Sequence, residues 1–294
     1  MSWALFLGCT VPVRNLNYEA AVRKTAAGLG LELADLPGFG CCGFPLKSLS
    51  SEQALVLTVR NLALAQADGR DVVAVCSACA ATLSEAEHVM SRDPDLAARV
   101  NERLAEIGLS YRGGVKVRHY TRLIHEEIGP ERIREAVVRP LDGGRFAPHY
   151  GCHYLKPAEA MDHFDSPEDP RSLTVLIEAL GAEAVEYPGL KDCCGGGVLG
   201  TDEDLAQRMA FGKLERIDQM GLTGLVVICP FCNVMFEGQQ KTMAKKFGSK
   251  IKVPLFFYPQ LLGLALGFTP EELGFKHNRI KDKDFLKAFE PAKG

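Results

Sequence analysis

Residues 72–83 read VVAVCSACAATL, and residues 225–236 read LVVICPFCNVMF. In both stretches a short apolar run ends at the first cysteine of a Cys-x2-Cys motif, as a buried strand would. Two further pairs of segments match over a similar distance: FLGCT (6–10) with HYGCH (149–153), and GFGCCGF (38–44) with KDCCGGG (191–197). The chain therefore contains one structural unit twice, at an offset of roughly 145 to 155 residues.

The two copies share one predicted order of strands and helices. In the first copy we expect strands at 3–7, 31–36, 72–75 and 115–120 and helices at 18–29 and 51–67; in the second, strands at 146–150, 184–187, 225–228 and 251–258 and helices at 170–180 and 202–220. Strands that alternate with helices favour parallel sheets covered by helices. We predict an α/β fold of two pseudo-symmetric repeats, each a small, mainly parallel sheet flanked by helices, with cysteines at the carboxyl ends of strands.

The repeat also predicts the domain organisation. An N-terminal unit covers residues 1–140 and a C-terminal one covers residues 141–275, with the connection marked by the proline and glycine breaks between Pro130 and Gly144. Residues 276–294 form a polar, lysine-rich C-terminal tail. We expect this tail to be solvated or to dock a partner.

The composition excludes several classes of protein. With 294 residues, 47% of them hydrophobic, the chain has ample material for packed cores and is not intrinsically disordered. Its formal net charge of −3 gives no electrostatic support for a nucleic-acid partner. The start, MSWALFLGCT, lacks the features of a secretory signal, and the most apolar window, 253–268, is shorter than the roughly 20 residues of a membrane span. We therefore expect a cytoplasmic protein without a membrane span.

Ten cysteines are divided equally between the two copies. Those of the first copy are Cys9, Cys41, Cys42, Cys76 and Cys79, and those of the second are Cys152, Cys193, Cys194, Cys229 and Cys232. Each lone cysteine, Cys-Cys pair and Cys-x2-Cys motif follows a predicted strand, and open α/β sheets build their sites at the carboxyl ends of strands. We therefore expect the five thiols of each copy to converge.

Four interpretations of these thiols compete. Disulfides are disfavoured in a reducing compartment, and they would leave one of five thiols unpaired. A structural zinc site needs four ligands, and adjacent cysteines chelate a single ion poorly, although zinc stays open as an alternative. Buried, inert cysteines do not explain why the pattern occurs twice. Iron–sulfur ligation fits best, because neighbouring cysteines can bind different irons of one cluster.

The cysteine pattern resembles that of a known family. The duplicated arrangement of a lone cysteine, Cys-Cys-Gly and Cys-x2-Cys resembles the paired CCG domain, and the segments FLGCTVPVRNLNYEAAVR (6–23) and YGCHYLKP (150–157) resemble the B subunit of heterodisulfide reductase. The resemblance covers nearly the whole chain. It implies two noncubane [4Fe-4S] clusters, one held by the five cysteines of the first copy and the other by the five cysteines of the second.

The resemblance also implies a function and partners. A protein of this kind is the oxidoreductase component that reduces a disulfide, such as the mixed disulfide of coenzyme M and coenzyme B, to two thiols, with one electron from each cluster. Its partners would be the C subunit, with ferredoxin-like cubane [4Fe-4S] clusters, and the flavin-containing A subunit of a heterodisulfide reductase complex. The chain lacks the Cys-x2-Cys-x2-Cys-x3-Cys-Pro run of such cubane clusters, so we expect one component of a complex. The alternative is an electron-transfer or membrane-docking CCG protein in a quinone-linked complex for succinate, lactate or glycolate oxidation.

Three basic side chains near the lone cysteines are candidates for the reaction itself. His153 and Lys156 follow Cys152, and Arg14 follows Cys9, so these side chains are placed to bind an anionic substrate group or to protonate a leaving thiolate. Surface or charge-balancing roles are the alternative. Of the other histidines, His119 and His149 lie beside strand ends, whereas those at 88, 125, 163 and 277 have ordinary helix or loop positions. Most of the seven histidines are expected to be structural. The lysines at 241, 245, 246, 250 and 252 are expected to form a solvated face or to dock an acidic partner.

Overall fold

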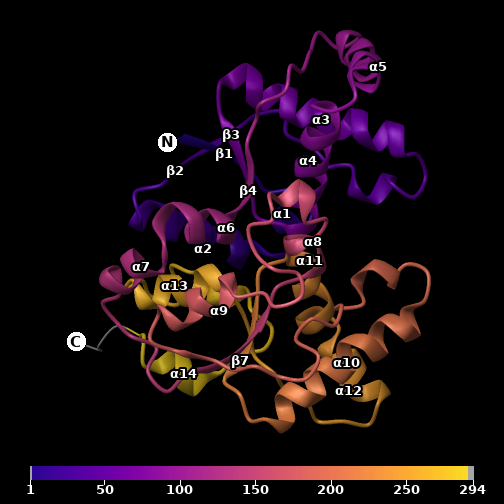
Figure 1. Cartoon of the computed structure of the whole chain (residues 1–294). Coiled ribbons are helices and arrows are strands. Elements are labelled where there is room, and N and C mark those ends of the chain that lie inside the picture. Colours follow the sequence, from indigo (N-terminus) through magenta and orange to yellow (C-terminus); the bar gives the residue numbers. More distant parts are fainter. Residues whose placement is uncertain (1, 291–294) are drawn as a thin grey trace.

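The computed structural model describes residues 2–290, and each half of the chain forms one four-stranded sheet (Figure 1). The first sheet has the order β2-β1-β3-β4 and is built from β1 (Ser2–Phe6), β2 (Glu32–Asp35), β3 (Asp71–Ala74) and β4 (Val117–His119). The second has the order β6-β5-β7-β8 and is built from β5 (Arg145–His149), β6 (Glu183–Ala184), β7 (Gly224–Val227) and β8 (Leu255–Phe257). All neighbouring strands are parallel. The predicted α/β fold of two parallel repeats is confirmed.

Helices cover both sheets. In the first half they are α1 (Val11–Arg14), α2 (Leu16–Gly28), α3 (Ser51–Asp68), α4 (Ser77–Met90), α5 (Pro94–Ala105) and α6 (Tyr120–Leu123), which continues as a π-helical turn at 124–128. From residue 130 onward they are α7 (Pro130–Ala136), α8 (Cys152–Leu155), α9 (Ser172–Glu178), α10 (Glu203–Gln219), α11 (Pro230–Asn233), a π-helical turn at 234–238, α12 (Gln240–Lys246), α13 (Tyr258–Ala265) and α14 (Lys283–Lys287). The segment predicted as a connection at 130–144 thus begins with a helix, since Pro130 at its first position is preorganised for helical φ and Ile133 is fully buried.

The two longest helices, α3 and α10, begin at residues whose side chains cap the helix. At the start of α3 the Ser50 side chain accepts a hydrogen bond from the Gln53 N–H, and the helix ends at Gly69, whose φ of 72° suits glycine. The Asp202 side chain caps α10 in the same way by accepting a hydrogen bond from the Leu205 N–H. Both helices therefore run from a Cys-Cys loop to the next buried strand.

The two halves pack on each other through their helices. Helix α2 of the first half lies against α13 of the second, near the middle of the molecule (Figure 1). The Tyr18 ring of α2 stacks on Phe257 at 4.0 Å between ring centroids. Lys24 of α2 also forms a 3.2 Å ion pair with Glu272. The first half therefore covers part of the second sheet's helical layer.

The C-terminal segment is packed, which corrects the expectation of a solvated extension for residues 276–290. Leu286 and Phe289 are 7% and 5% exposed, and the Asn278 amide is buried and donates to the Leu255 carbonyl at 2.9 Å. The buried Glu237 carboxylate accepts hydrogen bonds from the N–H groups of residues 279 and 280. The composition of this segment is polar on average, but a few of its side chains are apolar and recur at helical spacing. These apolar side chains pack onto the second unit. Residues 291–294 lie outside the described part of the chain.

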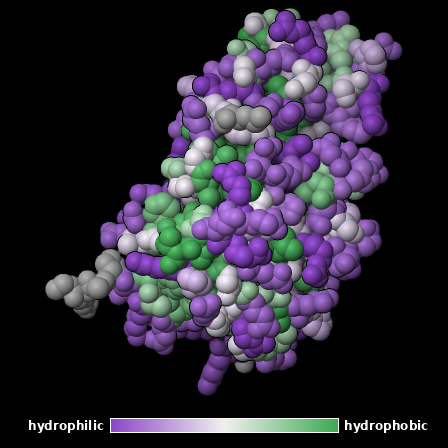
Figure 2. All heavy atoms as spheres, turned by 60° about the vertical axis from the view of Figure 1, so that its left-hand side comes forward, coloured by the Kyte–Doolittle hydropathy of each residue, from purple (hydrophilic) through white to green (hydrophobic). Residues whose placement is uncertain are grey.

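The surface is largely polar on the face drawn in Figure 2, where apolar side chains gather over the middle of the molecule. Among residues 2–290, no helix combines the length and the apolar character needed to span a membrane. The predicted division of the two units at residue 140 stays a prediction.

Candidate functional site

The cysteines of the first unit lie at the carboxyl end of its sheet. Cys9 follows β1 and is exposed, Cys41 and Cys42 occupy the loop before α3, and Cys76 and Cys79 lie at the start of α4. Hydrogen bonding with Cys79 is the main cause that lowers the pKa of Cys42 to about 7. Cys79 in turn neighbours Cys76, and Cys41 neighbours both Cys42 and Cys9. The five thiols form a series of neighbours that leads from the surface to the interior.

The second unit repeats this arrangement. Cys152 is exposed after β5, and hydrogen bonding with it is the main cause that lowers the pKa of Cys193 well below the ordinary thiol value. Hydrogen bonding with Cys193 is in turn the main cause that raises the pKa of Cys194 to about 12. Cys194 neighbours Cys232, which neighbours Cys229. The same series of neighbouring thiols is therefore found in both units, and the binding of one cofactor by all five stays a prediction.

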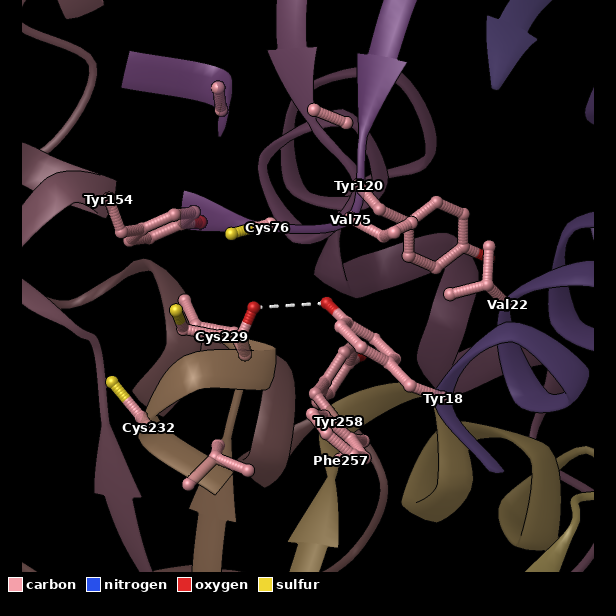
Figure 3. Packing of buried hydrophobic residues seen from close by; sticks show 14 of the residues in the cluster. Tyr18, Val22, Val75, Cys76, Tyr120, Tyr154, Cys229, Cys232, Phe257 and Tyr258 are labelled. Atoms are coloured by element: carbon pink, nitrogen blue, oxygen red, sulfur yellow. Dashed lines mark hydrogen bonds between the residues drawn. The ribbon is translucent and has the colours of Figure 1, made fainter. Parts of the chain in front are cut away.

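The two series meet inside the molecule. Cys76 and Cys229, the first cysteines of the two Cys-x2-Cys motifs, are hydrogen-bonding neighbours across the boundary between the units, and this contact is the main cause that raises the pKa of Cys76. Both side chains are nearly buried, at 7% and 5% exposure. In Figure 3 their sulfurs and that of Cys232 lie on the same side, away from the stack of Tyr18 on Phe257. The two sites are thus directly adjacent.

Glycine makes the Cys-Cys loops possible. Gly43 and Gly195 have φ values of 90° and 81°, which favour glycine. A Cβ at Gly43 would lie 2.6 Å from the Ala54 carbonyl oxygen, and one at Gly195 would lie 2.5 Å from that of Ala206. The N–H of each glycine also points to a sulfur, from Gly43 to Cys41 at 3.5 Å and from Gly195 to Cys193 at 3.4 Å. The Cys-Cys-Gly triplet therefore lets the loop lie directly on α3 or α10.

In the first unit, α3 holds this loop through neutral side chains. The Asn61 amide donates to the Cys41 carbonyl at 3.0 Å and accepts from the Gly40 N–H at 3.0 Å. The Thr58 hydroxyl donates to the Cys42 carbonyl at 2.7 Å. Both side chains are almost completely buried, so the hydrogen bonds that fix the loop are partly shielded from water.

In the second unit, a histidine contacts one of the thiols, and a buried lysine contacts that histidine. The Nε2 of His149 lies 3.3 Å from the Cys232 Sγ, and its Nδ1 lies 3.1 Å from the Nζ of Lys213. An ammonium only donates, so Nδ1 accepts and the Nε2–H points to the sulfur. Lys213 also donates to the Leu190 carbonyl at 3.0 Å and is 1% exposed. Burial lowers the pKa of Lys213 to about 8, which leaves it mostly charged at pH 7.

Two side chains of the first unit bind the backbone beside Cys229. The Tyr18 hydroxyl donates to the Ile228 carbonyl at 3.0 Å, shown by the dashed line in Figure 3, and the Nε2 of His119 lies 2.9 Å from the same oxygen. The Nδ1 of His119 accepts from the Thr121 N–H at 3.1 Å, so its Nε2 carries the hydrogen. Burial lowers the pKa of His119 to about 4 and keeps it neutral. The first unit therefore fixes the strand end of the second unit that leads into Cys229.

Two of the three predicted reactive residues lie close to Cys152, and the third lies at the end of the short helix that follows Cys9. His153 lies next to Cys152, and its ring meets the Phe44 ring of the first unit edge-on at 4.9 Å. Lys156 is exposed and lines a cavity of about 70 Å³ together with His149 and Cys152. Arg14 is exposed at the end of α1. The roles proposed for these three residues stay predictions.

Sequence reasoning missed Lys213 and Tyr18. Lys213 lies on an amphipathic helix, where a lysine is usually solvated, and nothing in its neighbours along the chain indicated burial. The one available signal was the repeat, because the offset between the Cys-Cys pairs aligns Lys213 with Asn61. Among the lysines that were expected to form a solvated or docking face, Lys246 forms a 2.7 Å ion pair with Asp204.

The residues present fit an iron–sulfur group. Their donors are thiols arranged in series, so neighbouring sulfurs are placed to bind different irons of one cluster. The backbone N–H groups of Gly43, Gly195 and Gly196 point to cysteine sulfurs at 3.4 to 3.5 Å, as suits thiolates. Within residues 2–290, no three His, Cys, Asp or Glu side chains are grouped closely enough to hold a single metal ion.

Relatives match almost the whole chain. The cysteine-rich CCG domain family matches residues 3–84 and 146–237. The B subunit of the ferredoxin:CoB-CoM heterodisulfide reductase of Methanosarcina mazei is 38% identical over 287 residues, which cover 96% of this chain and 95% of that protein. A protein of Archaeoglobus profundus, named as similar to the B subunit of heterodisulfide reductase, is 34% identical, with 93% of each chain covered. The 8-methylmenaquinol:fumarate reductase membrane anchor subunit of Wolinella succinogenes is 30% identical, with 95% of this chain and 96% of that protein covered.

A solved structure shares the fold. The crystal structure of a hypothetical protein from Helicobacter pylori superimposes with a TM-score of 0.77 at 19% sequence identity. The match covers 95% of this chain and 52% of that chain, so this protein spans about half of the solved one. At this identity the likeness concerns the fold alone.

Proposed function

Because this chain belongs to the family of duplicated cysteine-rich CCG-domain proteins that includes the B subunit of heterodisulfide reductase, we propose that it is the iron–sulfur component of a heterodisulfide-reductase-like complex. In that role it reduces a small-molecule disulfide, such as the mixed disulfide of coenzyme M and coenzyme B, to two thiols. The observation that carries the proposal is the pair of five-thiol sites that meet at Cys76 and Cys229. Two adjacent sites suit a reaction that needs two electrons at one place.

The chain's own residues would hold and shield the cofactor. The ligands would be Cys9, Cys41, Cys42, Cys76 and Cys79 in one site and Cys152, Cys193, Cys194, Cys229 and Cys232 in the other. Two noncubane [4Fe-4S] clusters bound there would supply one electron each to the disulfide. The buried thiols, such as Cys79 and Cys232, keep water from the inner side of each site.

The exposed side of the sites is where a substrate would enter. Cys9 and Cys152 are the two exposed thiols. His153 and Lys156 follow Cys152 in the chain, and Arg14 ends the short helix after Cys9. Their positive or proton-donating groups would bind anionic arms of the disulfide and protonate a thiolate product. The edge-on contact of the His153 ring with Phe44 of the first unit would orient that ring beside Cys152.

Partners would deliver the electrons. We propose the C subunit of such a complex, with ferredoxin-like cubane [4Fe-4S] clusters, and, beyond it, the flavin-containing A subunit, in the cytoplasm. The relatives from Methanosarcina are named as subunits, which supports a role in a complex.

Anaerobic purification of the full chain tests the assignment. Two four-iron clusters predict about eight irons and eight acid-labile sulfides per chain. Replacement Cys42→Ser should remove the signal of one cluster and Cys194→Ser that of the other. The loaded protein, reduced by dithionite, should then reduce a disulfide from a panel that includes the coenzyme M–coenzyme B disulfide. Stoichiometric zinc without sulfide, or inertness toward every disulfide, would overturn the proposal.

A second candidate function is favoured by one relative. The Wolinella succinogenes protein, 30% identical over nearly the whole chain, is named a membrane anchor subunit of an 8-methylmenaquinol:fumarate reductase. This chain would then pass electrons between a quinone and a partner dehydrogenase while docked on a membrane. Reduction of a menaquinone analogue by the loaded protein, together with binding to lipid vesicles and no disulfide reduction, would select this candidate.

A further inference from the structure

The two cysteine sites have different surroundings at equivalent positions. The alignment of FLGCT with HYGCH pairs Phe6 with His149. Gly43 and Gly195 make the same close approach to Ala54 and Ala206, so α3 and α10 align residue by residue. This alignment pairs Asn61 with Lys213. The first site therefore has an apolar ring and a neutral amide where the second has an imidazole and an ammonium.

The charged pair is connected to the sulfurs of the second site. Lys213 donates to His149 at 3.1 Å, and the His149 N–H points to the Cys232 sulfur at 3.3 Å. His149 and Lys213 are 2% and 1% exposed, so water screens neither the charge nor the hydrogen bond. A hydrogen bond to a ligand sulfur and a nearby positive charge both favour the reduced state of an iron–sulfur cluster.

Other charges near the Cys-Cys loops do not cancel this difference. Arg60 donates to the Gly38 carbonyl at 2.8 Å over the first loop. Arg216 donates to the Pro188 carbonyl at 3.1 Å over the second, where it also pairs with Asp192. Both arginines are partly exposed and screened by solvent. The buried lysine has no charged counterpart at the equivalent position of the first unit, where α3 carries Asn61.

We propose that His149 and Lys213 give the two sites unequal reduction potentials, with the second unit's cluster the more easily reduced. The inference rests on the iron–sulfur assignment of the proposed function. The step concerned is the transfer of a single electron from a reductant to the cluster of the second unit, and no bond is formed or broken in it. His149 and Lys213 act through Cys232 and are positioning residues.

A potentiometric titration of the anaerobic full chain with dithionite, followed by EPR, tests the order. The wild-type protein should show two reduction waves, and Cys194→Ser should remove the wave at the higher potential. Lys213→Met and His149→Phe should each shift that wave alone to lower potential. We expect a change of about tenfold in the ratio of reduced to oxidised cluster, which is about 59 mV for a one-electron couple.

A matched control separates the buried charge from net charge. Arg208→Met removes one positive charge from the same helix α10, but the Arg208 side chain is 64% exposed, so neither wave should move. Loss of the lower wave in Cys194→Ser, unshifted waves in both variants, or failure of both variants to bind the second cluster would overturn the inference. Absence of iron and sulfide from the wild-type chain would instead overturn the proposed function, so the two failures are distinguishable.

Discussion

Replacement of Gly43 by alanine tests how the Cys-Cys loop is held against α3. The new methyl group would lie 2.6 Å from the Ala54 carbonyl oxygen and 2.8 Å from the Thr58 hydroxyl, whereas ordinary van der Waals contact begins at about 3.4 Å. Both neighbours belong to the buried face of α3, so they cannot move away freely. The backbone conformation at Gly43, with φ at 90°, adds strain of its own.

Gly69 provides the matched control. It also has a left-handed backbone, with φ at 72°, but a Cβ there would meet nothing within 4 Å. Gly69→Ala should lower the free energy of unfolding by about 1 kcal/mol, which is the conformational cost alone. Gly43→Ala adds overpacking of about 1 to 3 kcal/mol, so we expect a total of roughly 2 to 4 kcal/mol.

Urea unfolding of the loaded protein, with iron determination, measures both consequences. Gly43→Ala should displace the loop that carries Cys41 and Cys42, and so lower the iron content toward half, while Gly69→Ala should keep the full content. Equal losses of stability in the two variants, with full iron in both, would refute the reasoning that close approach is what demands glycine.

Three further outcomes are expected from urea unfolding. Tyr18→Phe should lower the free energy of unfolding by about 1 kcal/mol, because it removes one hydrogen bond to the Ile228 carbonyl and keeps the ring stack; no change would mean that this bond is not made. Leu286→Ala should cost about 2 to 3 kcal/mol because the side chain is buried beside Phe289, whereas a free tail would give no loss. Burial raises the pKa of Glu237 above its ordinary 4.5, so the native protein keeps a proton that the unfolded chain releases. The contribution of Glu237 to the free energy of unfolding should therefore decrease as pH rises from 4.5 through the native pKa. Glu237→Gln should remove this decrease. The same dependence of the free energy of unfolding on pH in the variant and the wild type would contradict this.

The sequence predicted most elements because their signals are local. Helix α3 was expected at 51–67 and runs from Ser51 to Asp68, since a serine cap and a glycine stop bound it. Strand β3 was expected at 72–75 and covers Asp71–Ala74. Strand β6 is shorter than the predicted 184–187 and covers only Glu183–Ala184, where it pairs with Arg145 and Phe146 of β5 at the sheet edge.

Features that depend on tertiary contacts were not predictable in this way. The cysteine spacing indicated that five thiols meet in each unit, but it held no information on the contact between Cys76 and Cys229. The burial of Lys213 depends on how the Cys-Cys loop lies over α10, and composition alone suggested a solvated lysine. The C-terminal segment was misjudged for the same reason, since a few apolar side chains such as Leu286 decide its packing.

The packing of α2 on α13 has a consequence for how such a protein can arise by duplication. A half-length chain would leave this helical face uncovered unless two identical copies associated, and identical protomers in a symmetric dimer present identical surroundings to both cysteine sites. Two sites that differ, as Asn61 and Lys213 make them differ, require two halves of different sequence. Covalent fusion guarantees that each molecule contains one half of each kind.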